Sequence, residues 1–143
     1  MRKMLVIGAM LMLTKNAFAM PAWDGIYNCK TKEQTGGVLI VKTVNGKLVL
    51  QGFDTGSPAM NNGLECANKS SGPMVSGSIS MSIDSACDDK SLKQTISMTA
   101  GNTTTAIKIS LVQTSPNNLN ISVAIGNPND PSEMVSADLS CTK

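Results

Sequence analysis

Trp23-Asp24-Gly25-Ile26-Tyr27-Asn28-Cys29 is the segment from which the fold is best deduced, because its residues alternate as in a β-strand. Successive side chains of a strand point to opposite faces, so Trp23, Tyr27 and Cys29 share one face. The same alternation recurs close to the end of the sequence, at Val135, Ala137, Leu139 and Cys141. We therefore expect a strand near each end of the domain, with one cysteine on the inward face of each.

The first nineteen residues have the features of a secretory signal peptide. Arg2 and Lys3 precede an apolar run from Met4 to Leu13, and Ala17-Phe18-Ala19 supplies the small residues of a cleavage site. We expect cleavage after Ala19, one domain over residues 20–143, and export to the periplasm or the medium. A helix that spans a bilayer needs about twenty apolar residues, so we expect no membrane span.

Four cysteines in an exported chain are expected to form two disulfides, because that compartment oxidises thiols. The sequence contains no histidine that would complete a common zinc site. Among the possible pairings, the inward faces of the first and last strands favour Cys29 with Cys141, provided that those strands are neighbours. That choice leaves Cys66 to pair with Cys87.

Period-two alternation dominates the rest of the chain and predicts an all-β domain. Asn45-Gly46 favours a type I′ turn and predicts a hairpin between Val38–Val44 and Lys47–Phe53. The clearest strand is Val75–Ile83, in which apolar residues and glycine alternate with serines. Further strands are expected at Trp23–Thr31, Leu64–Asn68, Leu92–Ala100, Ile107–Leu111, Leu119–Ile125 and Met134–Cys141.

About eight short antiparallel strands can close into an up-and-down, lipocalin-like barrel or split into a two-sheet β-sandwich. Short connections and the inward cysteines at both ends favour the barrel. The segment Trp23–Cys29 also loosely resembles the first strand of lipocalin-like barrels, which often carries a glycine and a tryptophan. Here Trp23 precedes Gly25, in the reverse of the usual order. The resemblance implies the same barrel architecture.

Only three large aromatic rings remain after Ala19, those of Trp23, Tyr27 and Phe53. They are the candidates for contact with a ligand, since aromatic rings supply much of the apolar surface of binding pockets. Trp23 and Tyr27 share a strand face, and the favoured interpretation of this pair is that it plugs the core.

Charge argues against a nucleic-acid partner. Cleavage after Ala19 removes Arg2, Lys3 and Lys15 and no acidic residue, so the formal net charge changes from +2 to −1. The scattered lysines that remain form no basic patch for a phosphate backbone, and no arginine is left to strengthen one.

Composition also argues against catalysis. A serine or cysteine nucleophile usually needs a neighbouring base, and histidine is absent. A pair of carboxylates is the remaining route to hydrolysis. Most acidic residues fall in expected turns, where aspartate is favoured for local hydrogen bonding. We therefore expect a protein that is not an enzyme and that holds no cofactor or metal.

These observations predict an exported module that acts by binding. It would either present loops to a protein partner, such as a hydrolase that it inhibits, or hold a small apolar ligand inside the barrel. The protein partner is favoured, because side chains alone can fill an eight-stranded barrel. An open cavity of about 300 Å³ or more would instead favour the ligand. The alternative is a structural or adhesive β-sandwich subunit of a surface assembly, recruited through a free strand edge.

Overall fold

A computed structural model of the protein describes residues 22–52 and 63–143, which form ten β-strands in one antiparallel sheet. The all-β class is therefore confirmed, whereas the expected signal peptide lies outside the described residues. The strands are β1 (Gly25–Lys30), β2 (Gly36–Val44), β3 (Lys47–Gln51), β4 (Leu64–Glu65), β5 (Lys69–Ser76), β6 (Ile79–Cys87), β7 (Ser91–Ala100), β8 (Thr103–Ser115), β9 (Asn118–Gly126) and β10 (Val135–Thr142).

Helical structure is almost absent from the described ranges. A single turn of 3₁₀ helix, η1 (Pro131–Glu133), precedes β10. The Asp130 side chain accepts a hydrogen bond from the Ser132 backbone N–H at its start, as a helix-capping residue does. Within residues 22–52 and 63–143, no helix is long and apolar enough to cross a membrane.

The sheet consists of two meanders joined through the first and last strands. Its order is β4-β3-β2-β1-β10-β9-β8-β7-β6-β5, so every neighbouring pair is consecutive in sequence except β1 and β10. In that pair Cys29 lies opposite Cys141. The two terminal strands are therefore neighbours, which is the condition under which the sequence favours a Cys29–Cys141 disulfide.

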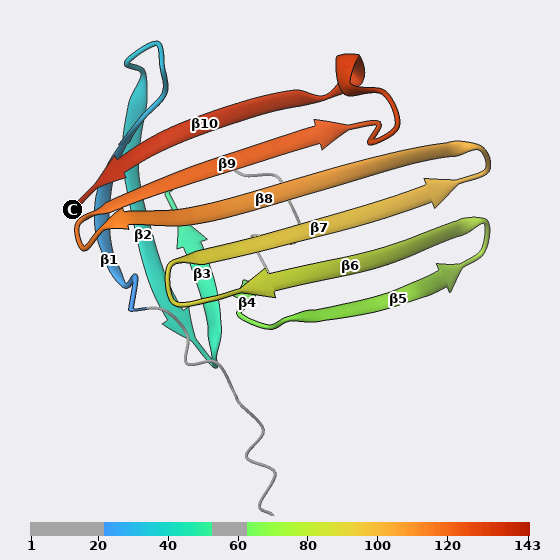
Figure 1. The fold of residues 1–143 in the computed structure, drawn as a ribbon, viewed down its shortest axis with the longest axis horizontal. Helices are drawn as coiled ribbons and strands as arrows, with labels where there is room; N and C mark the ends of the chain where they lie inside the picture. The colour runs from blue at the N-terminus through green and yellow to red at the C-terminus, as the bar shows by residue number, and fades with distance from the viewer. Residues whose placement is uncertain (1–21, 53–62) are drawn as a thin grey trace, which may run out of the picture.

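The contact between β1 and β10 is short, and this sets the shape of the molecule. Only Asn28–Lys30 pairs with Ser140–Thr142, whereas β9 and β10 pair along the whole length of β10. Beyond that short ladder the two meanders diverge, and Figure 1 shows β1, β2 and β3 running steeply across the direction of β5–β10. The inner face of the first meander thereby packs on the inner face of the second.

One hydrophobic core lies between the two meanders and draws on both of them. Its largest members include Trp23, Leu39 and Leu48 from the first meander and Leu92 and Leu111 from the second, all fully buried. The apolar area that these side chains remove from water is the main favourable term in folding. Because the rings of the described residues are few, aliphatic side chains supply most of that area.

The two disulfides are the pair that the strand faces favour and the pair that this choice leaves. Cys29 bonds to Cys141, across the short β1–β10 ladder, and Cys66 bonds to Cys87. Cys29, Cys87 and Cys141 are buried in the core. Two disulfides are typical of proteins from oxidising compartments outside the cytoplasm.

The sheet is not closed, because β4 and β5 form its two edges and do not pair with each other. Physical reasons for this are visible on both edges. β4 offers only two residues, Leu64 and Glu65. In β5, Pro73 has no backbone N–H to donate, and the register shifts between Ser71 and Met74. Neither edge presents a regular row of hydrogen-bonding groups to the other.

The expected hairpin at Asn45-Gly46 is confirmed. Both residues have positive φ, 50° at Asn45 and 74° at Gly46, and they join β2 to β3 through a two-residue loop. Asparagine and glycine tolerate this backbone conformation better than other residues, which explains why they occupy the type I′ turn.

The expected single strand Val75–Ile83 is wrong, because the chain reverses at Gly77-Ser78. Ser76 pairs with Ile79, and Gly77 has a φ of 62°, as the first central residue of a type II′ turn requires. The alternation continues through a two-residue turn, so the pattern resembles one strand. Val75 consequently points to the outer face, where it is 69% exposed.

Removal of each disulfide should lower stability by an amount that depends on the loop it closes. Cys29 and Cys141 are 112 residues apart, and Cys66 and Cys87 are 21 apart. Chain entropy predicts losses of about 5 and about 3 kcal/mol for the two paired Cys→Ala replacements. Urea unfolding of both variants measures them, and a larger loss from the Cys66/Cys87 replacement would contradict this ranking.

Candidate functional site

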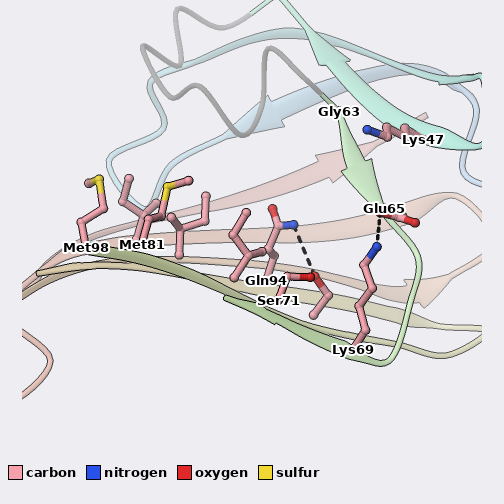
Figure 2. A pocket seen from close by; sticks show the side chains of 12 residues that line it. Lys47, Gly63, Glu65, Lys69, Ser71, Met81, Gln94 and Met98 are labelled. Atoms are coloured by element: carbon pink, nitrogen blue, oxygen red, sulfur yellow. Dashed lines mark hydrogen bonds and ion pairs between the residues drawn. The ribbon is translucent and has the colours of Figure 1, made fainter. Parts of the chain in front are cut away.

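A cavity of about 290 Å³ lies at the opening of the sheet, between the strands that fail to close it. Its walls come from β3 and β4 on one side and from β5, β6, β7 and β8 on the other. Figure 2 shows these side chains from close by. The cavity exists because β4 and β5 separate here instead of pairing.

One end of the cavity is apolar. Side chains that lie opposite one another on adjacent strands form two rows across its floor. The first row contains Ile83, Ile96 and Ile107, and the second contains Met81 and Met98. Aliphatic and thioether groups of this kind contact apolar ligands without demanding a particular hydrogen-bonding pattern.

The other end of the cavity is polar. Lys69, Ser85 and Gln94 lie opposite one another on β5, β6 and β7, and they form the next row after the isoleucines. Glu65 and Lys47 complete this end from β4 and β3. Figure 2 shows the order of these side chains along the cavity, from Met98 and Met81 at one end, through Gln94, to Lys69 and Glu65 at the other.

The charged groups at the polar end are paired in part. Lys69 Nζ lies 2.7 Å from Glu65 Oε2, and both side chains are nearly half exposed. The hydrogen bond from Lys69 holds the pKa of the Glu65 carboxyl below its usual value, against the opposing effect of burial, while the charges of Lys69 and Lys47 lower it further. An exposed pair of this kind contributes about 0–1 kcal/mol to the free energy of unfolding. Its main effect is to hold one positive and one negative side chain side by side at this end of the cavity.

Gln94 is the most unusual side chain of the cavity. It is 9% exposed and is the one polar residue among the buried residues that the structure describes. Its Nε2 donates to Ser85 Oγ at 3.3 Å, while its Oε1 is buried and accepts no hydrogen bond. Buried polar atoms usually have a partner, so an unpaired amide oxygen in a cavity wall calls for an explanation.

The apolar rows continue past the cavity onto an open surface. Ile107 lies opposite Ile125, and Ile125 lies opposite Val135. Ile125 is 45% exposed and Val135 is 76% exposed, although both are on the inward face of the sheet. The core residues of β1–β3 pack over the other end of this face, so an apolar strip extends the cavity floor toward β10.

The cavity does not contain the aromatic residues that the sequence suggested. Trp23 and Tyr27 are fully buried in the core, where the Tyr27 hydroxyl donates to the Trp23 carbonyl at 2.8 Å. Neither ring lines the cavity. Phe53 lies outside the described residues. The burial of the pair agrees with the interpretation that it plugs the core.

Sequence reasoning missed the residues that line the cavity, although Gln94 gave a usable signal. It occupies an inward position in the strand Leu92-Lys93-Gln94-Thr95-Ile96, where the alternation calls for an apolar residue. A polar residue at such a position marks either a buried network or a binding site. The polar row could not be found from sequence, because Lys69 and Ser85 fit the pattern of exposed strand residues equally well.

The cavity offers little for acid–base or metal chemistry among its described lining residues. Glu65 is the one acidic residue there, and it is paired with Lys69. Across residues 22–52 and 63–143, no three acidic or cysteine side chains gather in a metal-binding arrangement. What the walls do provide is an apolar floor, one buried amide and a charged rim.

Comparison with known proteins gives no relative from which a function could be transferred: no family model, no curated protein and no solved structure matches the chain.

Asn68 should be important for keeping the cavity walls in place. It lies between β4 and β5, where its side chain accepts from the Cys87 backbone N–H at 2.8 Å and donates to the Cys87 carbonyl at 3.2 Å. Loss of both bonds in Asn68→Ala should lower the free energy of unfolding by about 1–3 kcal/mol. Asn120→Ala, at an exposed position of β9, is the matched control. Equal urea midpoints for the two variants would contradict this role.

Proposed function

We propose that the protein is an exported binding protein that holds a small, mostly apolar ligand in the cavity between β4 and β5. The observation that carries this proposal is the cavity itself, with about 290 Å³ of space above isoleucine and methionine rows. That volume lies just below the usual range of ligand pockets, about 300–1,000 Å³, so the cavity suits a small ligand. A barrel filled by its own side chains would leave no such space.

The apolar strip beside the cavity supports the same function. Ile125 and Val135 are inward residues that no part of the first meander covers fully. Exposed apolar groups beside a pocket add to the surface that a bound ligand covers. Each Å² of apolar surface removed from water contributes about 25 cal/mol to the free energy of binding. A ligand longer than the cavity would therefore gain contact here.

The chain is proposed to be an incompletely closed barrel and not a two-sheet sandwich. The hydrogen-bonded order runs continuously through all ten strands, and the break falls between β4 and β5, which are consecutive in sequence. Export to the periplasm or the medium, after cleavage at Ala19, is proposed with it, and the two disulfides support an oxidising compartment.

Assembly through a strand edge is less well supported than ligand binding. An edge that accepts a strand from another protein needs a regular row of free backbone groups. β4 contains two residues, and β5 is interrupted by Pro73 and by the register shift next to it. Natural sheets use short edges, prolines and bulges of this kind to prevent edge-to-edge pairing.

A protein partner is the second candidate, and one observation favours it. Ile26 and Val38 are 63% and 50% exposed on the outer face of β1 and β2, where their strands are paired. This outer patch lies on the face of the sheet opposite to the core. A partner bound there would leave the cavity free, so the two functions can be tested separately.

Binding of a fluorescent apolar probe tests the proposal. N-phenyl-1-naphthylamine should bind the native protein, and Met98→Lys should weaken binding at least about tenfold, because a bound probe would remove water from an ammonium at the apolar end of the cavity. Met98 is 36% exposed, so the new ammonium can reach water and folding should survive.

The matched control is Val75→Lys, which places the same charge on the outer face nearby. Val75 is 69% exposed and does not line the cavity, so probe affinity should stay within about twofold of the native value. Native protein that binds no probe, or equal losses in the two variants, would refute a ligand site in this cavity. Loss of binding in Ile26→Lys alone would point to the outer patch.

A further inference from the structure

We infer that the ligand of this cavity is amphipathic: an aliphatic chain that ends in a hydrogen-bond donor, such as a hydroxyl or an amide N–H, which Gln94 Oε1 accepts. The inference rests on the proposed function and adds the chemical class of the ligand. It follows from the one buried polar side chain of the described core and from its place between the two ends of the cavity.

The hydrogen bonding of Gln94 leaves one acceptor unused. Nε2 donates to Ser85 Oγ, and no described group donates to Oε1. A buried acceptor that has lost its water without gaining a donor weakens the folded state. A ligand that donates to Oε1 removes this penalty, whereas a ligand that only accepts hydrogen bonds leaves it in place.

Packing does not explain why a glutamine occupies this position. The neighbouring inward residues of β7 are Leu92 and Ile96, and the residue opposite on β8 is Ile109. All three are buried and apolar, so a methionine or leucine side chain would suit the same surroundings. The amide is therefore better explained by recognition of a polar group than by filling of the core.

Access to Oε1 requires only a local movement. Gln94 lines the cavity, and Figure 2 shows it between the apolar side chains and the charged rim, with its amide raised from the strand. The terminal torsion of a glutamine side chain has a broad energy minimum. A rotation about it turns the oxygen toward the cavity without moving the backbone, and it exchanges the long 3.3 Å bond from Nε2 to Ser85 Oγ for a bond from the ligand to Oε1.

The position of Gln94 also sets the direction of the ligand. The isoleucine row lies on one side of it, and the row of Met81 and Met98 lies beyond. From Gln94 to Met98 the strand rises about 13 Å, which is close to the length of an extended decyl chain. A donor group at Gln94 thus places an aliphatic chain along β7, over both rows.

A carboxylate in place of the donor group fits less well. An ionised carboxyl has no hydrogen to donate and would meet Oε1 as a second acceptor. Both lysines of the cavity, Lys69 and Lys47, lie with Glu65 at its charged rim, beyond Gln94, and Lys69 is paired with Glu65 at 2.7 Å. The structure therefore favours a neutral donor at the depth of Gln94.

The test compares two probes with the same decyl chain, in which the hydroxyl hydrogen of the first is replaced by a methyl group in the second. 1-Decanol donates a hydrogen bond, and decyl methyl ether can only accept one, so each is titrated against bound N-phenyl-1-naphthylamine. The ratio of the ether Kd to the alcohol Kd is measured for the native protein and for Gln94→Met, which has a similar shape and no amide. The ratio should fall about tenfold in Gln94→Met, because the preferred partner of the hydroxyl is gone.

Thr95→Val is the matched control, because it replaces a polar residue of the same strand on the opposite face. Its ratio should equal that of the native protein. Gln94→Met removes the unpaired acceptor together with the long bond to Ser85 Oγ, so its urea midpoint should stay close to that of the native protein. Should that variant fail to fold, Gln94→Leu replaces it.

The outcomes separate this inference from the proposed function. If both probes displace the dye and the ratio changes by less than about threefold in the Gln94 variant, the inference is wrong and the ligand site stands. If the dye binds and neither probe displaces it, the aliphatic ligand class is wrong. If the dye itself does not bind, the proposed function fails and the inference fails with it.

Discussion

The short ladder between β1 and β10, with the Cys29–Cys141 disulfide across it, is the constraint on which the rest of the structure depends. Three residue pairs and one covalent bond hold the two meanders together as one sheet. A long ladder would keep the meanders side by side. A short one lets them diverge, so that the inner faces of β1–β4 and β5–β10 close on a common core. Because the bond closes a loop of most of the domain, it also restricts the unfolded chain strongly.

The same constraint explains where the cavity lies. Joining the terminal strands leaves β4 and β5 as the two edges, and the link between them is held by Cys66–Cys87 and by the side chain of Asn68. This second junction fixes the separation of the edges without pairing them. Side chains from both edges then surround a space that the core does not fill. The open sheet is thus a consequence of the topology, and the cavity is a consequence of the open sheet.

The sequence predicted the parts of the fold that depend on local alternation and on turn chemistry. It identified the Asn45-Gly46 hairpin from its turn residues and the preferred Cys29–Cys141 pair from the inward faces of two strands, on the condition, met in the structure, that those strands are neighbours. It missed the turn at Gly77-Ser78, because a two-residue reversal preserves alternation. It also missed the open edges and the cavity, which depend on the divergence of two meanders and on non-local contacts of Gln94 and Lys69 that no local pattern encodes.

The central claim is that the cavity between the sheet edges holds an aliphatic ligand along the isoleucine and methionine rows. Nuclear Overhauser contacts between 1-decanol and protein methyl groups, in a sample labelled at isoleucine, valine and methionine methyls, test it most directly. The account predicts contacts from the chain of the alcohol to Met81, Met98 and Ile83, and none to Ile26 or Val38 on the outer face. Contacts confined to Ile26 and Val38, or no contacts with any methyl group at saturating alcohol, would contradict it.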